Sequence, residues 1–94
     1  MSAYVIVEVD VTNPEVYEEY RPLAGESVAR HGGRFIVRGG KNEAWEGEWS
    51  DRIVVLEFED LDAARAWYHS DDYQAAVRIR HRSSTARMIA VEGT

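Results

Sequence analysis

The sequence predicts an α+β sandwich in which two helices cover one face of a four-stranded antiparallel sheet. Segments with strand and helix periodicity follow one another in the order β-α-β-β-α-β. The strands are apolar on both faces, which a sheet with water on one side does not need. In 4–11, every second residue is valine, and the other set begins with Tyr4 and Ile6. This order is the ferredoxin-like arrangement, with the first and third strands in the middle of the sheet.

Length and composition limit what the chain can be. Its 94 residues predict a single ferredoxin-like domain over 1–94, and 45% apolar with 30% charged residues are globular values. The net charge of −6 argues against nucleic acid or an anionic membrane as a partner. The chain has no cysteine, which excludes disulfides and fits a cytoplasmic location, and no apolar run is long enough to cross a membrane.

The first strand covers 3–11, and the first helix follows it. Asn13 is suited to the N-cap and Pro14 to the first helical position. Pro22 is expected to kink or interrupt this helix, and the His-Gly-Gly run at 31–33 supplies a glycine for its C-terminal cap. One helical stripe holds the residues expected to face the core: Val16, Tyr20, Leu23, Ala24, Ser27 and Val28.

The second and third strands cover 34–38 and about 52–59. In the second strand, Phe35 and Val37 are expected on one face and Ile36 on the other, together with two arginines. The thirteen residues between these strands, 39–51, are long for a hairpin connection. They predict either a functional loop or an arm used in assembly.

The second helical region is expected in two pieces. Asp60 and Ser70 are suited to the two N-caps. Trp67 is expected at the edge of the inward stripe of the first piece. The inward residues of the two pieces are expected to be Leu61, Ala64 and Tyr68, then Tyr73, Ala76 and Val77. A turn at 83–85 and a fourth strand at 87–92 complete the order.

The two faces of the predicted sheet differ in what must cover them. The helices would cover Val5, Val7, Val9, Phe35, Val37, Val54, Leu56 and Phe58. The residues facing away would be Tyr4, Ile6, Ile36, Ile53, Val55 and Met88. An apolar patch of that kind usually marks an interface. The sequence therefore predicts a homodimer through the sheet face away from the helices.

Charged residues share that outer face. The register that aligns the apolar residues of strands two and three places three pairs opposite each other: Arg38 and Ile53, Ile36 and Val55, and Arg34 and Glu57. Glu8 lies on the same face of the first strand. These charges either fix the register and rim of the dimer or form a polar pocket, with Glu8 or Glu57 as a base and Arg38 as an anion anchor.

Three segments carry a resemblance to a known family. They are Gly33-Arg34-Phe35-Ile36-Val37-Arg38-Gly39-Gly40, Glu46-Gly47-Glu48-Trp49 and the run from Ala63 to Gln74. Together they resemble the domain-of-unknown-function family 1330 of the dimeric α/β-barrel superfamily, over nearly the whole chain. The resemblance implies ferredoxin-like protomers that pair into a dimeric α/β barrel. It implies no established reaction, cofactor or catalytic residue, although superfamily relatives include cofactor-independent oxygenases, haem-binding enzymes and isomerases.

A small-molecule site is predicted between the helices and the sheet. Arg38, Gly39 and Gly40 form either a plain turn or an anion site of guanidinium and loop amides. The aromatic residues either pack the core or wall a pocket: Tyr20, Trp49, Trp67, Tyr68 and Tyr73. His69 is the candidate for proton transfer, because histidine titrates near neutrality. His31 is expected to be a capping or surface residue.

Two functions fit these observations. The first is a protein that binds or transforms a small organic acid without a cofactor, with Arg38 and His69 converging in the pocket. The second is a noncatalytic dimeric accessory or regulatory module with filled cores. The basic run at 78–82 either pairs with acidic residues of the protein or binds an anion. No histidine pair has the spacing of metal ligands, so no metal site is predicted.

Overall fold

Four strands and three helices make up the computed structural model, which describes residues 1–94. In chain order they are β1 Ala3–Val11, α1 Pro14–Arg30, β2 Arg34–Arg38, β3 Arg52–Phe58, α2 Leu61–His69, α3 Asp71–Ser83 and β4 Ser84–Glu92. The sheet has the order β2-β3-β1-β4 with antiparallel pairing throughout. The predicted β-α-β-β-α-β order, with its second helical region in two pieces, is confirmed.

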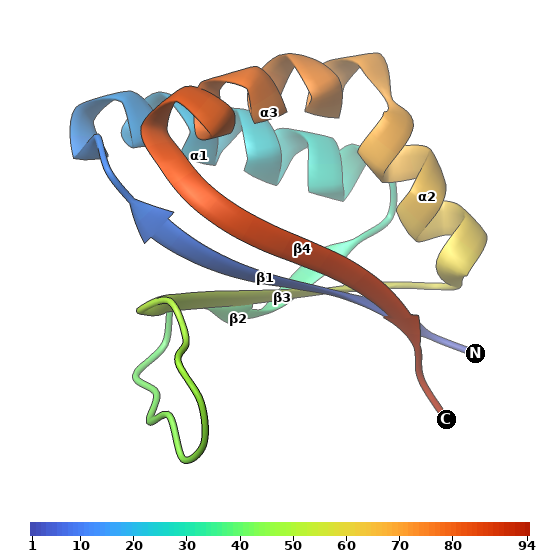
Figure 1. Ribbon diagram of the computed structural model, residues 1–94. Helices are drawn as coiled ribbons and strands as arrows, with labels where there is room; N and C mark the ends of the chain where they lie inside the picture. Colours follow the sequence, from blue (N-terminus) through green and yellow to red (C-terminus); the bar gives the residue numbers. More distant parts are fainter.

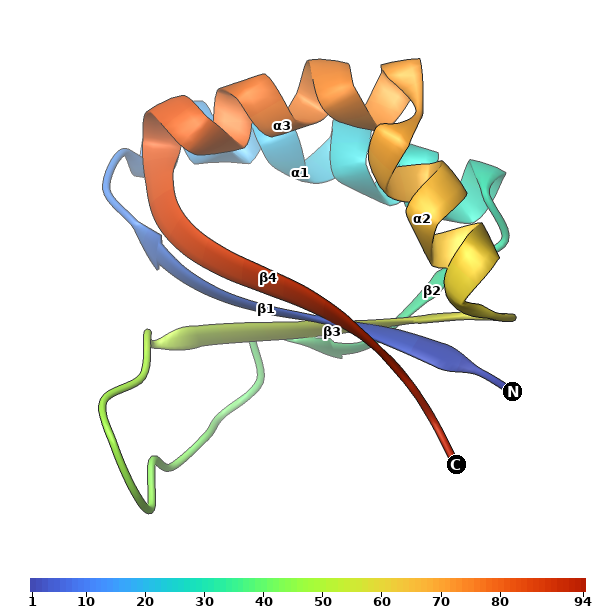
Figure 2. The same ribbon diagram turned by 45° about the vertical axis from the view of Figure 1, so that its right-hand side comes forward.

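The layers also follow the prediction. All three helices lie on one side of the sheet, and α1 and α3 run side by side across it (Figure 1). The segment 39–51 projects from the opposite side, which Figure 2 shows after a turn of 45°. The main core lies between the helices and the inner sheet face, where Val5, Val7, Val9, Leu56 and Phe58 are buried.

Helix α1 begins as predicted but does not break at Pro22. The Asn13 side chain accepts a hydrogen bond from the Val16 amide, and Gly32 takes the positive φ of 75° that ends the helix. The expected interruption is wrong, since α1 is continuous from Pro14 to Arg30. Pro22 removes one backbone bond from the helix, and packing of the buried face against α3 outweighs that loss.

The inner face of α1 is rotated relative to the predicted stripe. Tyr17 is 5% exposed, whereas Leu23 is 42% exposed and faces water. A similar correction applies to Trp67, which is 1% exposed at the centre of the core rather than at the edge of the inward stripe of α2. Its indole Nε1 donates a hydrogen bond to Ser27 Oγ at 3.1 Å, which satisfies the buried N–H.

Strand β4 starts without the predicted turn at 83–85. Helix α3 runs to Ser83 and β4 begins at Ser84. The hydroxyl groups of both serines donate hydrogen bonds to carbonyls one turn back in α3. The Ser83 carbonyl in turn accepts hydrogen bonds from the backbone amides of Thr12 and Asn13.

Met88 was expected on the outer face, but it pairs with Val7 and packs against the core, so that expectation is wrong.

Strand β2 contains a bulge that reverses one arginine. Arg34 pairs with Glu57 as predicted, at 2.6 Å between guanidinium and carboxylate. Ile36 is then the extra residue, so Val37 pairs with Val55, and Arg38 pairs with Val54 instead of Ile53. Because neighbouring residues of a strand point to opposite faces, this shift turns Val37 outward and Arg38 toward the helices.

The charges of the outer face are paired within the protomer. Glu57 accepts from Arg34, which holds the pKa of this carboxyl below its usual value. Glu8 accepts from Arg87 of β4 at 2.9 Å. Neither carboxylate is left as a free base, which argues against a polar pocket with Glu8 or Glu57 as its base.

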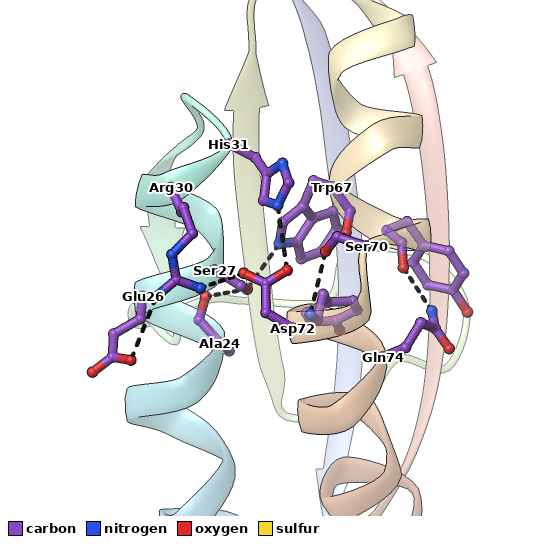
Figure 3. A network of polar contacts seen from close by, with 11 residues as sticks. Ala24, Glu26, Ser27, Arg30, His31, Trp67, Ser70, Asp72 and Gln74 are labelled. Atoms are coloured by element: carbon purple, nitrogen blue, oxygen red, sulfur yellow. Dashed lines mark hydrogen bonds and ion pairs between the residues drawn. The ribbon is translucent and has the colours of Figure 1, made fainter.

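A polar network joins the C-terminal end of α1 to the start of α3 (Figure 3). Asp72 accepts from Arg30 and lies 3.3 Å from His31 Nε2. The Ser70 hydroxyl, then Arg30 and His31, hold the pKa of Asp72 well below its usual 3.8. His31 thus serves as the C-cap of α1 and contacts the Asp72 carboxylate, in keeping with its predicted role.

This network predicts how stability depends on acidity. Because the pKa of Asp72 is lower in the folded state, its contribution is fully present above pH 3.8 and declines as pH falls below that value. The Asp72→Asn variant should therefore melt below the wild type at pH 6, and the gap should narrow from pH 4 to pH 2. Thermal melts followed by circular dichroism at each pH measure this difference in melting temperature. A difference that is constant with pH would refute the ion-pair assignment. Asp71→Asn, at an exposed neighbouring position, is the control.

Candidate ligand-binding site

A cavity of about 80 Å³ lies between α1 and the inner face of the sheet. Most of its wall is apolar, contributed by Val7, Val9, Tyr17, Ala24, Val28, Phe35, Val54, Leu56, Trp67 and Met88. The remaining lining residues are Tyr20 and four arginines: Arg21, Arg38, Arg52 and Arg80. No carboxylate lines the cavity, although the chain has 17 acidic residues and a net charge of −6. The cavity is therefore a positively charged site in an acidic protein.

Arg80 is the most buried of these charges. It projects from α3, is 5% exposed, and its Nε has no hydrogen-bond partner in the protein. Its guanidinium carbon lies 6.0 Å from the centre of the Tyr20 ring. Removing an arginine charge from water without a counter-charge costs several kcal/mol. A bound anion at Arg80 would offset that cost.

Two tyrosines lie beside Arg80. The hydroxyls of Tyr20 and Tyr73 are 2.9 Å apart, so one of them donates to the other. Burial raises the pKa of both phenols, and the Arg80 charge only partly opposes this effect. Both are therefore neutral at physiological pH, and the pair keeps one O–H that can donate to a ligand. Neutral phenols beside a guanidinium can bind an anion but do not supply a strong base.

Arg52 and Arg38 come from the sheet side. Arg52 is half-buried at the start of β3, and its Nε also lacks a partner. Arg38 is exposed and stacks its guanidinium 3.6 Å from the centre of the Phe35 ring. Among the four arginines only Arg21 forms an ion pair, with Glu18 on the surface of α1. Three guanidinium groups of the cavity therefore have no carboxylate partner.

The two glycines after Arg38 differ in their structural role. Gly39 has a φ of 68°, and its amide donates to the Ile53 carbonyl at 2.8 Å. That amide is thus used by the sheet and does not serve an anion. A Cβ at position 39 would collide with Arg52 Nη1, whereas one at Gly40 would meet nothing within 4 Å. Gly39 is the residue that lets Arg52 take its place, and Gly40 lies outside the cavity.

Gly39→Ala is expected to disturb the site, and Gly40→Ala is its matched control. An alanine at position 39 would have to keep the left-handed φ of 68°, which costs an L-residue about 1–2 kcal/mol, and its methyl group would displace the Arg52 guanidinium. Gly39→Ala should lower the melting temperature, while Gly40→Ala should leave it within error of the wild type. Equal melting curves for the two variants would show that Arg52 does not depend on Gly39.

The structure brings together some of the predicted site residues. Tyr20, Trp67 and Arg38 line the cavity, and Tyr73 joins it through its bond to Tyr20. Trp49 does not: it is 56% exposed in the 39–51 segment, where its indole donates to the Glu46 carbonyl. Trp49 is therefore not part of the cavity wall, contrary to the expectation.

His69 and Tyr68 lie at a different place. They line an open groove of about 370 Å³ between α2 and β4, with the Tyr68 and His69 rings 5.2 Å apart edge to face. Arg38 is absent from that groove, and His69 is absent from the arginine cavity. The structure does not bring Arg38 and His69 together, so proton transfer by His69 to an anion held by Arg38 has no geometric support.

Arg80 and Arg52 are the site residues that sequence reasoning missed. Arg80 was placed in the basic run 78–82, yet it continues the inward stripe of Tyr73, Ala76 and Val77 at helical spacing. That spacing was the available signal for a buried guanidinium. No signal in the sequence marks Arg52 as a site residue, because it is the first residue of a strand after a long connection.

Two other kinds of functional feature have no residues placed to form them. No group of three or more His, Asp or Glu side chains is placed to hold a metal ion. None of the helices has the length and apolarity needed to cross a membrane. The arginine cavity is thus the feature that combines enclosure with unpaired charge.

Comparison with solved structures supports the fold. RPA0582 from Rhodopseudomonas palustris, a protein of unknown function, is 18% identical with a TM-score of 0.78, over 99% of this chain and 82% of its own. A dimeric ferredoxin-like protein of unknown function from Jannaschia sp. CCS1 is 15% identical with a TM-score of 0.75, over 99% and 100%. SnoaB, a cofactor-independent oxygenase from Streptomyces nogalater, is 15% identical with a TM-score of 0.69, over 99% and 93%.

Comparison of sequences identifies the family. No curated protein matches the chain. The domain of unknown function DUF1330 matches residues 2–94, which is nearly all of the sequence. The resemblance seen in the Arg-Gly-Gly, Glu-Gly-Glu-Trp and Trp-Tyr segments is thereby confirmed, and the chain belongs to the DUF1330 family.

Proposed function

We propose that this protein binds a small organic anion in the arginine cavity between α1 and the sheet. The observation that carries the proposal is Arg80, a guanidinium that is 5% exposed and has neither a carboxylate partner nor a hydrogen bond at Nε. An unpaired buried charge is costly, and proteins retain such groups where a ligand completes them. The apolar walls suit the carbon skeleton of an acid, and the arginines suit its carboxylate.

The dimensions of the cavity limit the ligand. Its volume of about 80 Å³ exceeds the roughly 10–15 Å³ that one water needs, and it is below the ~150 Å³ of a cavity that takes up benzene. A ligand of a few carbon atoms fits that range. A longer tail would extend past Arg21 and Arg38 toward solvent.

Binding has more support than catalysis. The lining residues include no histidine and no carboxylate, and the two tyrosines at the site are neutral. The site thus lacks a side chain that could remove a proton at neutral pH. SnoaB is a cofactor-independent oxygenase of the same fold, which supports a small organic ligand but assigns no reaction to this chain.

A pairwise comparison of acids with their amides tests the proposal. Short carboxylic acids should raise the melting temperature of the protein at pH 7, and the corresponding neutral amides should not. A ligand at 100 times its dissociation constant stabilises by about 2.7 kcal/mol, which amounts to several degrees for a domain of this size. Thermal-shift measurements at constant ionic strength decide the question, and equal shifts from acid and amide would overturn the proposal.

A second proposal concerns assembly, and the exposed apolar face favours it. We infer that two copies pair through the outer sheet face, where Ile6, Ile36, Val37, Ile89 and Val91 are all at least 36% exposed. The segment 39–51 extends past that face in both views, and it carries Trp45 at 87% exposure (Figures 1 and 2). Dimeric proteins among the structural neighbours support the same assembly. A noncatalytic dimeric module is compatible with this surface and needs no ligand.

A further inference from the structure

Two buried guanidinium nitrogens, not one, lack a partner in this protein. They are the Nε atoms of Arg52 and Arg80, and both residues line the arginine cavity. A buried donor without an acceptor is uncommon in folded proteins, and each such atom calls for an explanation. Two of them in one cavity point to a ligand with more than one acceptor group.

The two arginines enter the cavity from opposite layers. Arg52 comes from the first residue of β3, in the sheet, and its guanidinium carbon lies 6.0 Å from the centre of the Tyr17 ring. Arg80 comes from α3, in the helical layer, and lies at the same distance from the Tyr20 ring. A single carboxylate that binds one guanidinium side-on uses both of its oxygens there. The other arginine would keep its unpaired Nε.

We propose that the ligand carries two separate acidic groups, one bound by Arg80 in the helical layer and one bound by Arg52 in the sheet. The inference rests on the proposed function of the same cavity and names the class of its ligand as a short dicarboxylic acid. Charge supports it, because the cavity has four arginines and no carboxylate, and only Arg21 is paired. A monoanion would leave at least two guanidinium groups of the cavity without a counter-charge. The Tyr20–Tyr73 pair adds a neutral hydrogen-bond donor beside the acidic group that Arg80 would bind.

The test compares two acids of matched length. Butanedioate and butanoate have the same four-carbon chain and differ in whether the far end is a carboxylate or a methyl group. Isothermal titration calorimetry at pH 7 and fixed ionic strength should show butanedioate binding about tenfold tighter or more, since a hydrogen bond to a charged group is worth that factor. Arg52→Met should lower the affinity for butanedioate by more than it lowers the affinity for butanoate. Arg78→Met, an exposed position on α3, is the control and should preserve the ratio.

The outcomes separate this inference from the proposed function. Equal affinities for the two acids, both lost in Arg80→Met, would overturn the dicarboxylate assignment and leave anion binding in place. Failure of both acids and of methyl phosphate to bind would overturn the proposed function itself. Tighter binding of methyl phosphate than of butanedioate would also refute the assignment, because its two charges lie on one group.

Discussion

Arg80→Met is expected to stabilise the ligand-free protein and at the same time to abolish anion binding. The methionine fills most of the space of the arginine stem and removes a guanidinium that is 5% exposed without a counter-charge. Replacing buried charges by apolar residues of similar volume has raised stability by about 1–4 kcal/mol in other proteins. The hydroxyls of Tyr20 and Tyr73 keep the hydrogen bond between them. Urea unfolding measures the first effect, and calorimetry with a short carboxylic acid measures the second.

The opposite signs of the two effects make this prediction specific. A structural arginine would lose stability on replacement, because its packing and hydrogen bonds are lost together. A residue kept for binding loses function and gains stability. Arg78→Met, two residues away and exposed, should change unfolding by no more than about 0.5 kcal/mol and leave binding intact. Destabilisation by Arg80→Met with unchanged binding would show that Arg80 belongs to the core and not to a site.

The fold was predictable because several local signals agreed. The alternation of 3–11, the Asn13-Pro14 and Ser70 helix starts and the glycine after α1 each matched the structure. The errors arose where tertiary packing outweighed a local rule. Pro22 would break an isolated helix, but packing of the buried face of α1 against α3 keeps the helix continuous. Trp67 was misplaced because one side chain had to fill the space between Phe58 and Tyr73, whose rings lie 5.4 and 4.1 Å from its own.

The candidate site was harder to predict for a physical reason. The bulge at Ile36 shifts the register of β2 by one residue, and a shift of one residue moves side chains to the other face. Nothing in a run of three apolar residues between two arginines reports such a bulge. Arg38 was therefore assigned to the outer face, away from the cavity that it lines. The helical spacing of Tyr73, Ala76 and Arg80 did contain information, but the neighbouring basic residues made Arg80 look like part of a surface patch.

Ile6→Asp is expected to convert the protein from a dimer to a folded monomer. Ile6 lies in central strand β1 between Val55 of β3 and Ile89 of β4, on the face proposed for assembly. In the protomer it is 36% exposed, so an aspartate there remains in contact with water. In a dimer the same carboxylate would be buried without a partner, at a cost of several kcal/mol. Each 1.4 kcal/mol weakens association tenfold.

Sedimentation velocity distinguishes the two states, because the wild type should have twice the 10.7 kDa mass of one chain and Ile6→Asp should have that mass once. Leu23→Asp is the matched control, since Leu23 is 42% exposed but lies on α1, on the far side of the sheet from the proposed interface. It should remain dimeric. A wild-type protein that sediments as a monomer would refute the assembly, and so would an Ile6→Asp variant that stays dimeric. The far-ultraviolet circular dichroism spectrum of Ile6→Asp should match that of the wild type. Loss of the sheet spectrum would mean that the outer face is needed for folding, so that the protomer does not fold without its dimer partner.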